Sequence, residues 1–123
     1  MTLIEAISGI DAVKPNGFEQ IEKIKWLSEL DGRIKKEIID THEGGARVVF
    51  SEYTEDTPLD TVLLVPSPYD GIYLSWLEAK IDYANKEYGN YNNSSNMYNT
   101  AYRDYWRYYN RTHLPISGQR KYF

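Results

Sequence analysis

One amphipathic segment, residues 16–42, restricts the possible folds of this chain more than any other part of the sequence. Its apolar residues recur three or four positions apart, and this spacing predicts a long α-helix with one apolar face. Asn16 with Glu19 is a helix-start pattern, and the glycines at 44 and 45 end the segment. Other elements must cover the apolar face. Its residues are Ile21, Ile24, Leu27, Leu30 or Asp31, Ile34 and Ile38.

Three further segments carry helical signals. The run TLIE at 2–5 is a capping box, and the short helix that follows is expected to end before Pro15. In the run SPYD at 67–70, serine is a cap and proline takes the first helical position, so a third helix starts here and ends at Gly89. The last helix is expected in the run 90–113, with Asn92, Asn93 or Ser94 as its cap.

Two β-rich runs lie between the second and third helices, and an acidic loop joins them. Residues 46–50 and 61–66 are typical of short strands. We therefore expect a mainly α fold of about four helices, with a small β-hairpin between the long second helix and the third helix. The domain is expected to span 1–115 and to be followed by an extended C-terminal arm, 116–123. The acidic residues of the loop are Glu52, Glu55, Asp56 and Asp60.

Length and composition agree with one small domain. The chain has 123 residues and no cysteine, which excludes disulfides and thiolate metal sites. No apolar run approaches the roughly 20 residues that span a bilayer, and the N-terminus lacks a signal-peptide pattern, so we expect a soluble, unprocessed protein. The net charge of −4 disfavours broad affinity for nucleic acid, although residues 103–123 carry +4 and the remainder −8.

The sequence offers little catalytic chemistry. His42 and His113 each stand at the end of an expected helix, without a second metal ligand at a suitable spacing. Glu52 and Asp56 lie in a polar loop, whereas acid–base catalysis needs carboxylates in unlike environments. There is no glycine-rich phosphate loop and no nucleophile motif. We expect no enzymatic activity, no metal site and no cofactor.

The run NMYNTAYRDYWRYYNRTHLP at 96–115 is rich in tyrosine and arginine. On a helix the arginines occupy a different stripe from most of the tyrosines. The tyrosine face could pack in the chain's own core, contact another subunit, or stack nucleic-acid bases beside the basic groups. We treat it as a candidate subunit interface. Its residues are Tyr98, Tyr102, Tyr105 and Tyr109.

Three runs of this sequence are similar to a known group of proteins. They are KPNGFEQIEKIKWLSELDG, LLVPSPYDGIYLSWLEAKIDYANKEYGNYNN and YNTAYRDYWRYYNRTHLP, with the most specific parts at 66–70, 91–93 and 109–112. Over residues 3–115 the chain resembles small proteins encoded in the head-morphogenesis region of long-tailed bacteriophages of Gram-positive hosts. We identify these as the head–tail connector (adaptor) family.

The resemblance implies a structural virion protein of the neck, assembled in the bacterial host cytoplasm. Such connectors form a homo-oligomeric ring, commonly of about twelve subunits, in which one face of a subunit docks a different face of its neighbour. The ring lies beneath the portal protein, lets double-stranded DNA pass without sequence-specific binding, and receives a neck or tail-completion protein. The acidic loop would face the channel or the neck. Two alternatives are another neck or tail-completion protein of the same gene region and a nucleic-acid-binding helical module.

The resemblance also implies which part of this chain binds its partners. In connectors, extended C-terminal arms reach the portal or a neighbouring subunit. The corresponding residues here are Arg111, Thr112, His113, Leu114, Pro115, Arg120, Lys121, Tyr122 and Phe123.

Overall fold

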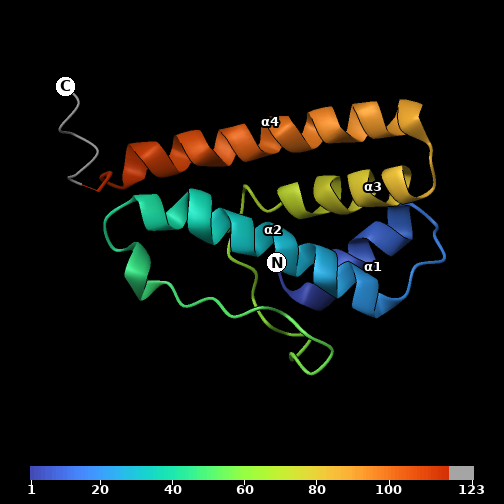
Figure 1. Cartoon of the computed structure of the whole chain (residues 1–123), viewed down its shortest axis with the longest axis horizontal. Coiled ribbons are helices and arrows are strands. Elements are labelled where there is room, and N and C mark those ends of the chain that lie inside the picture. The colour runs from blue at the N-terminus through green and yellow to red at the C-terminus, as the bar shows by residue number, and fades with distance from the viewer. Residues whose placement is uncertain (117–123) are drawn as a thin grey trace.

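The structure is a computed structural model that describes residues 1–116 (Figure 1). The described part is mainly helical, which confirms the expected fold class. Its α-helices and 3₁₀ turns, in chain order, are α1 (Leu3–Val13), α2 (Gln20–Glu37), η1 (Ile39–Thr41), η2 (Gly45–Arg47), α3 (Ile72–Ala84) and α4 (Tyr88–Thr112).

Helix α3 occupies the centre of the bundle because it contacts each of the other three α-helices. Figure 1 shows α4 running alongside α3 on one side, with α1 and α2 on the other. The long segment between η2 and α3 crosses the outer side of α2 and returns to α3. The bundle therefore has one helical layer above α3 and a mixed layer of helix and loop below it.

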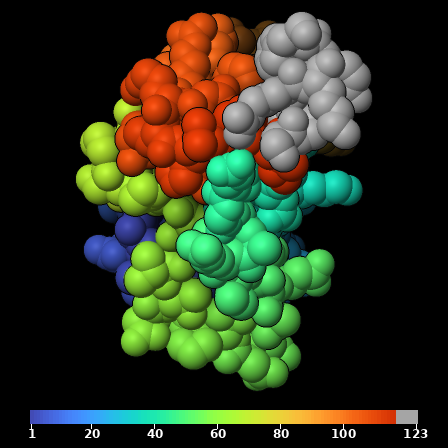
Figure 2. Space-filling view, turned by 90° about the vertical axis from the view of Figure 1, so that its left-hand side faces the viewer, coloured from blue at the N-terminus to red at the C-terminus, as the bar shows by residue number. Residues whose placement is uncertain are grey.

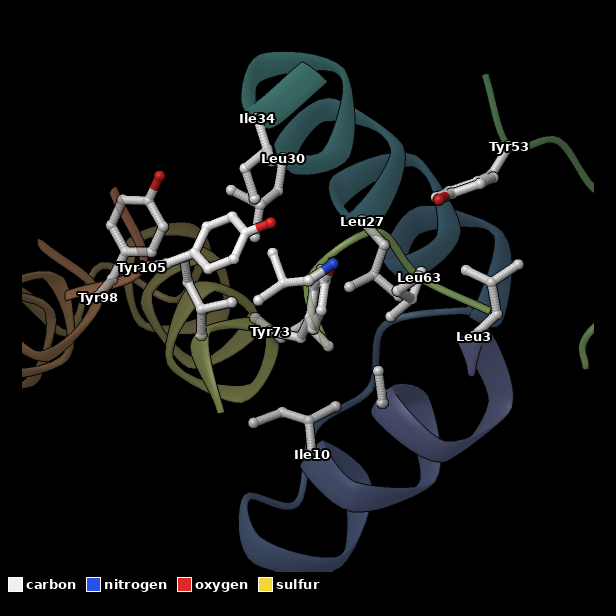
Figure 3. Close-up of a cluster of buried hydrophobic side chains, with 14 of the residues drawn as sticks. Leu3, Ile10, Leu27, Leu30, Ile34, Tyr53, Leu63, Tyr73, Tyr98 and Tyr105 are labelled. Atoms are coloured by element: carbon white, nitrogen blue, oxygen red, sulfur yellow. The ribbon is translucent and has the colours of Figure 1, made fainter. Parts of the chain in front are cut away.

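The core lies where the apolar faces of the four helices meet. Figure 3 shows leucine and isoleucine side chains from α1 and α2 facing aromatic side chains from α3 and α4. The predicted apolar face of the long helix is buried from Ile24 to Ile38, including its one polar member, Asp31, whereas Ile21 is only partly buried. Side chains with no exposed surface include Leu3, Leu27, Leu30, Ile34, Ile72, Tyr73, Leu77 and Ile81.

The first two helices begin in different ways. At α1 the predicted capping box is confirmed: Thr2 Oγ1 accepts the Glu5 amide (3.2 Å), and Glu5 Oε1 accepts the Thr2 amide (2.9 Å). The predicted start of the second helix at Asn16 is wrong, because α2 begins at Gln20. Asn16 instead closes a local turn, accepting the Phe18 amide (3.1 Å) and donating to the Lys14 carbonyl (2.9 Å). This competing local bonding is typical of asparagine.

The predicted boundaries around the third helix are also wrong. Ser67 and Pro68 lie in a turn, where the Tyr69 amide donates to the Pro66 carbonyl (2.9 Å), and α3 starts at Ile72. Gly89 does not end a helix but lies in the first turn of α4.

A Schellman motif ends α3 in place of the expected glycine. The Glu87 amide donates to the Asp82 carbonyl (2.9 Å), and the Lys86 amide donates to the Tyr83 carbonyl (3.0 Å). Lys86 takes the left-handed conformation (φ 59°) that glycine commonly supplies. Because this motif reverses the chain within three residues, α4 starts earlier than the asparagine cluster indicated.

The predicted β-hairpin is not formed, and this expectation was wrong. Within residues 1–116 the strand-like segment at 61–66 makes one isolated antiparallel bridge, Val62 with Thr2. The Leu3 amide donates to the Thr61 carbonyl (3.0 Å), and the Leu63 amide donates to the Met1 carbonyl (2.9 Å). The N-terminal residues thus pair with the segment 61–66, in the place where residues 46–50 were predicted to pair.

Asp31 fixes the long segment to the helices. Its Oδ2 accepts the Tyr53 hydroxyl (2.6 Å) and the Leu64 amide (3.0 Å), and its Oδ1 accepts the Tyr73 hydroxyl (2.7 Å). The Tyr73 oxygen in turn accepts the Val65 amide (2.7 Å). Burial raises the pKa of Asp31, and burial beside this carboxylate raises the pKa of Tyr53 and Tyr73. One carboxylate therefore connects α2, α3, the strand-like segment 61–66 and Tyr53 of the loop that precedes it.

We predict that Asp31→Asn lowers the free energy of unfolding by about 2 kcal/mol or more, because buried donors lose a charged acceptor. Chemical denaturation measures this as a lower midpoint. The control is Asp60→Asn, which alters an exposed side chain and is expected to stay within about 0.5 kcal/mol of the wild type. Equal midpoints for the two variants would contradict the role of Asp31.

The raised pKa of Asp31 also predicts a pH dependence. In the native state this carboxyl holds its proton to a higher pH than in the unfolded chain, so its contribution to stability falls as pH rises from about 3.9, the ordinary value, through the raised value. Asp31→Asn removes this contribution. The stability difference between wild type and variant should therefore be larger on the acid side of that window. Denaturation curves at a series of pH values test this, and a difference that grows with pH would refute it.

Candidate protein interaction site

A groove runs between α2 and the extended segment that follows η2. Its volume is about 710 Å³. Gly32 widens it, since a Cβ atom at this position would lie 3.5 Å from Phe50 Cε2. Ile21, Phe50 and Tyr53 provide apolar surface, and the Phe50 and Tyr53 rings meet edge to face at 5.4 Å. The lining residues are Ile21, Lys25, Ser28, Glu29, Gly32, Phe50, Glu52, Tyr53, Thr54 and Glu55.

The backbone along this groove is unpaired. The Val48 amide donates to the Gly45 carbonyl (3.0 Å), and the Tyr53 amide donates to Ser28 Oγ (2.9 Å). Between them, residues 49–52 form no backbone hydrogen bond with any other part of residues 1–116. They contain neither helix, turn nor bend. Four consecutive residues therefore present free amide and carbonyl groups, as an unpaired edge strand does. We call residues 49–52 the open edge.

Side chains of the open edge alternate between the protein and solvent. Phe50 packs toward α2, whereas Val49 is 86% exposed. A smaller hollow of about 220 Å³ borders the same segment, and Val62, itself 70% exposed, contributes to its wall. Two largely exposed valines thus flank one hollow. β-branched residues exposed beside unpaired backbone are suited to contact with another extended segment.

The acidic loop contributes to the groove only in part. Glu52 and Glu55 line it, whereas Asp56 and Asp60 are exposed outside its lining. All four lack an ion-pair partner among residues 1–116. Of the other charged lining residues, Glu29 pairs with Lys80 (2.9 Å). Together with Lys25, the lining side chains carry a net charge of −2, of which Lys80 balances one unit at Glu29. The excess negative charge at Glu52 and Glu55 favours a cationic partner.

The predicted tyrosine face packs mainly inside the chain. Tyr98, Tyr105 and Tyr109 are 6%, 2% and 7% exposed. Tyr98 contacts Trp76 with ring centroids 4.9 Å apart. The fourth tyrosine, Tyr102, is only partly buried; its hydroxyl donates to Glu37 Oε1 (2.6 Å). The surface that a partner can reach on this face is therefore confined to Tyr102 and its neighbours.

The first part of the predicted arm pairs with the end of η1. Figure 2 shows the last turns of α4 above the 3₁₀ turns. Pro115 bridges His42, and the Ile116 amide donates to the Thr41 carbonyl (3.1 Å). His113 stacks on the Tyr109 ring at 3.8 Å, while Leu114 is 61% exposed.

The remaining arm residues fall into two groups. Arg111 and Thr112 belong to the last turn of α4, where Thr112 Oγ1 donates to the Tyr108 carbonyl (2.9 Å). Arg120, Lys121, Tyr122 and Phe123 lie outside the described residues.

Two structural features of this region were not predicted from the sequence. The first is the open edge. It overlaps the strand-like run 46–50, which was predicted to pair with residues 61–66. The second is the buried His42, whose Nδ1 lies 2.7 Å from the Ile38 carbonyl and whose Nε2 lies 2.6 Å from Asn110 Oδ1. A histidine at the expected end of a helix indicated only an interaction with the last carbonyls. The contact with Asn110 joins segments 68 residues apart and has no local signal.

No cluster of three or more metal-binding side chains occurs among residues 1–116. In the same part of the chain, no helix combines the length and apolar character needed to cross a bilayer. No protein-family model, curated protein or solved structure matches the chain.

Tyr98→Phe is predicted to leave stability unchanged or to raise it slightly. The Tyr98 hydroxyl is buried without a hydrogen-bond partner in residues 1–116, and burial raises the pKa of this group to about 12. Removing an unsatisfied buried hydroxyl removes its desolvation cost. Tyr73→Phe is the matched control, because its hydroxyl bonds Asp31, and it should cost about 1 kcal/mol or more. A larger loss from Tyr98→Phe than from Tyr73→Phe in thermal denaturation would contradict this interpretation.

Proposed function

We propose that this protein is a structural, non-enzymatic subunit of a bacteriophage neck. It assembles into a ring beneath the portal, extends the channel through which double-stranded DNA passes, and docks a neck or tail-completion protein. The assembly forms in the bacterial host cytoplasm and remains in the virion. The resemblance of three sequence runs to head–tail connectors supports the location.

The open edge is the observation that carries the assembly part of the proposal. A small domain that leaves four residues of backbone unpaired, beside two highly exposed valines, has a surface suited to a partner. Exposed apolar side chains also occur elsewhere, including Val13, Tyr83 and Tyr88. Chemically different surfaces on one subunit are what a heterologous, ring-forming contact requires.

The charges favour a role in which DNA passes without being held. The four loop carboxylates have no ion-pair partner in residues 1–116 and would repel phosphates in a channel. A neck-facing position of the same loop would instead present these carboxylates to a basic partner.

A second candidate function, single-stranded nucleic-acid binding, is favoured by one feature of α4. Trp106 is 44% exposed and is flanked by the exposed Arg103 and Arg107. An exposed indole with exposed arginines nearby on the same helix is suited to base stacking. Binding of labelled single-stranded DNA at physiological salt that is lost in Arg103→Ala and Arg107→Ala would favour this function over the connector.

The connector proposal predicts rings of the purified protein in electron microscopy and matching density between portal and tail in intact particles. Removal of the gene from the phage should leave DNA-filled heads without tails, because the neck cannot be completed. Expression of the gene in trans should restore tailed particles and serves as the control. Normal tailed particles after the deletion would refute the role. Density further along the neck would assign the protein to another neck component.

A further inference from the structure

We propose that the groove along the open edge binds residues 117–123 of a second copy of this chain, as an added strand. The proposal rests on the self-assembly part of the proposed function and is independent of the location in a virion. Three properties of the groove carry it: unpaired backbone, uncompensated negative charge and an apolar floor.

The unpaired backbone defines the kind of occupant. Because residues 49–52 offer amide and carbonyl groups that no other described residue uses, an extended segment can pair with them. The pairing would give affinity through the main chain, and side chains on alternate positions would give specificity. Phe50 and Val49 already point to opposite sides of the open edge, so a partner strand would meet an apolar side chain on both sides.

The side chains of residues 117–123 have the complementary chemistry. Glu52 and Glu55 of the groove lining have no ion-pair partner within residues 1–116, and Arg120 with Lys121 carry two positive charges. In an extended strand Arg120 and Tyr122 lie on one side, and Lys121 and Phe123 lie on the other. Each side therefore presents one cation and one aromatic ring. The cations fit the glutamates of the rim, and the rings fit the apolar surface of Ile21, Phe50 and Tyr53.

The reach of the chain favours a second copy over the same copy. Ile116 is fixed to Thr41, and an extended chain advances about 3.3 Å per residue, so seven further residues can span at most about 23 Å from that point. Helix α2 recedes from Thr41 by about 1.5 Å per residue, which places Lys25 and Ile21 roughly 24–30 Å away. In the same copy the segment could reach Gly32 and Phe50, roughly 14 Å along the helix from Thr41, but not Lys25 and Ile21 at the far end. Occupation of the whole groove therefore needs a second copy. A neighbouring copy has no such limit.

The contact can be tested in full-length chains by charge reversal. The first variant, Arg120→Glu with Lys121→Glu, leaves the groove unchanged and reverses the charge of the C-terminal segment. A labelled peptide of residues 116–123, ISGQRKYF, should bind this variant saturably, because its own segment does not compete. Addition of Glu52→Lys and Glu55→Lys to the same chain should weaken peptide binding by about tenfold or more. The matched control replaces Asp56 and Asp60 by lysine, an equal charge change outside the groove lining, and should retain binding. Equal binding by the groove variant and the control would overturn the proposal.

Self-association provides the second measurement. Sedimentation of the wild type should show concentration-dependent assembly. Assembly should weaken in a chain with only the segment reversal, Arg120→Glu with Lys121→Glu, and in a chain with only the groove reversal, Glu52→Lys with Glu55→Lys. Mixing these two chains should restore it. Amide hydrogen exchange should show residues 49–52 gaining protection on assembly. Protection that is independent of concentration would mean that the segment binds within its own chain and would overturn the second-copy assignment. Rings that form equally well with the reversed segment would overturn this contact but leave the connector function standing. Peptide binding without rings would support the contact and refute the connector.

Discussion

The buried carboxylate of Asp31 is the interaction on which the rest of the structure depends. It accepts two tyrosine hydroxyls and one backbone amide, and none of these donors lies on its own helix. A buried charge is costly unless hydrogen bonds offset its loss of hydration, and all three bonds form only when Tyr53, Leu64 and Tyr73 are in place. The long segment between η2 and α3 therefore takes one path, although it contains no regular strand.

That path creates the candidate site. Tyr53 is held from two directions, by Asp31 through its hydroxyl and by Ser28 through its amide. The backbone of residues 49–52 consequently lies along α2 and forms no backbone hydrogen bond within residues 1–116. The site is thus a by-product of the core. The same bonds that order the segment leave the backbone of residues 49–52 without strand-to-strand hydrogen bonds. Any change that releases Tyr53 should disturb both stability and partner binding.

The sequence predicted the helical architecture more reliably than the connections. Repeats such as Ile24, Leu27 and Ile34 are local, so the spacing alone identified a buried helix face. The hairpin failed because strand-like composition does not specify which edge a segment pairs with, and Met1 and Thr2 filled the edge at Val62. Asp31 stood within the apolar stripe, but its partners lie 22 to 42 residues away. Contacts of that kind carry no local signal, and neither does the groove that they create.

The unpaired carboxylates beside the open edge have a consequence for the isolated subunit. An exposed strand edge is a common starting point for indiscriminate aggregation, and charged residues next to it commonly act as gatekeepers. Two copies that approached edge to edge would bring Glu52 and Glu55 of each chain together, and the like charges would repel. If the protein assembles as proposed, this repulsion would keep newly made chains apart at the open edge until a cationic segment is presented. In that assembly the loop would act as a safeguard between folding and association.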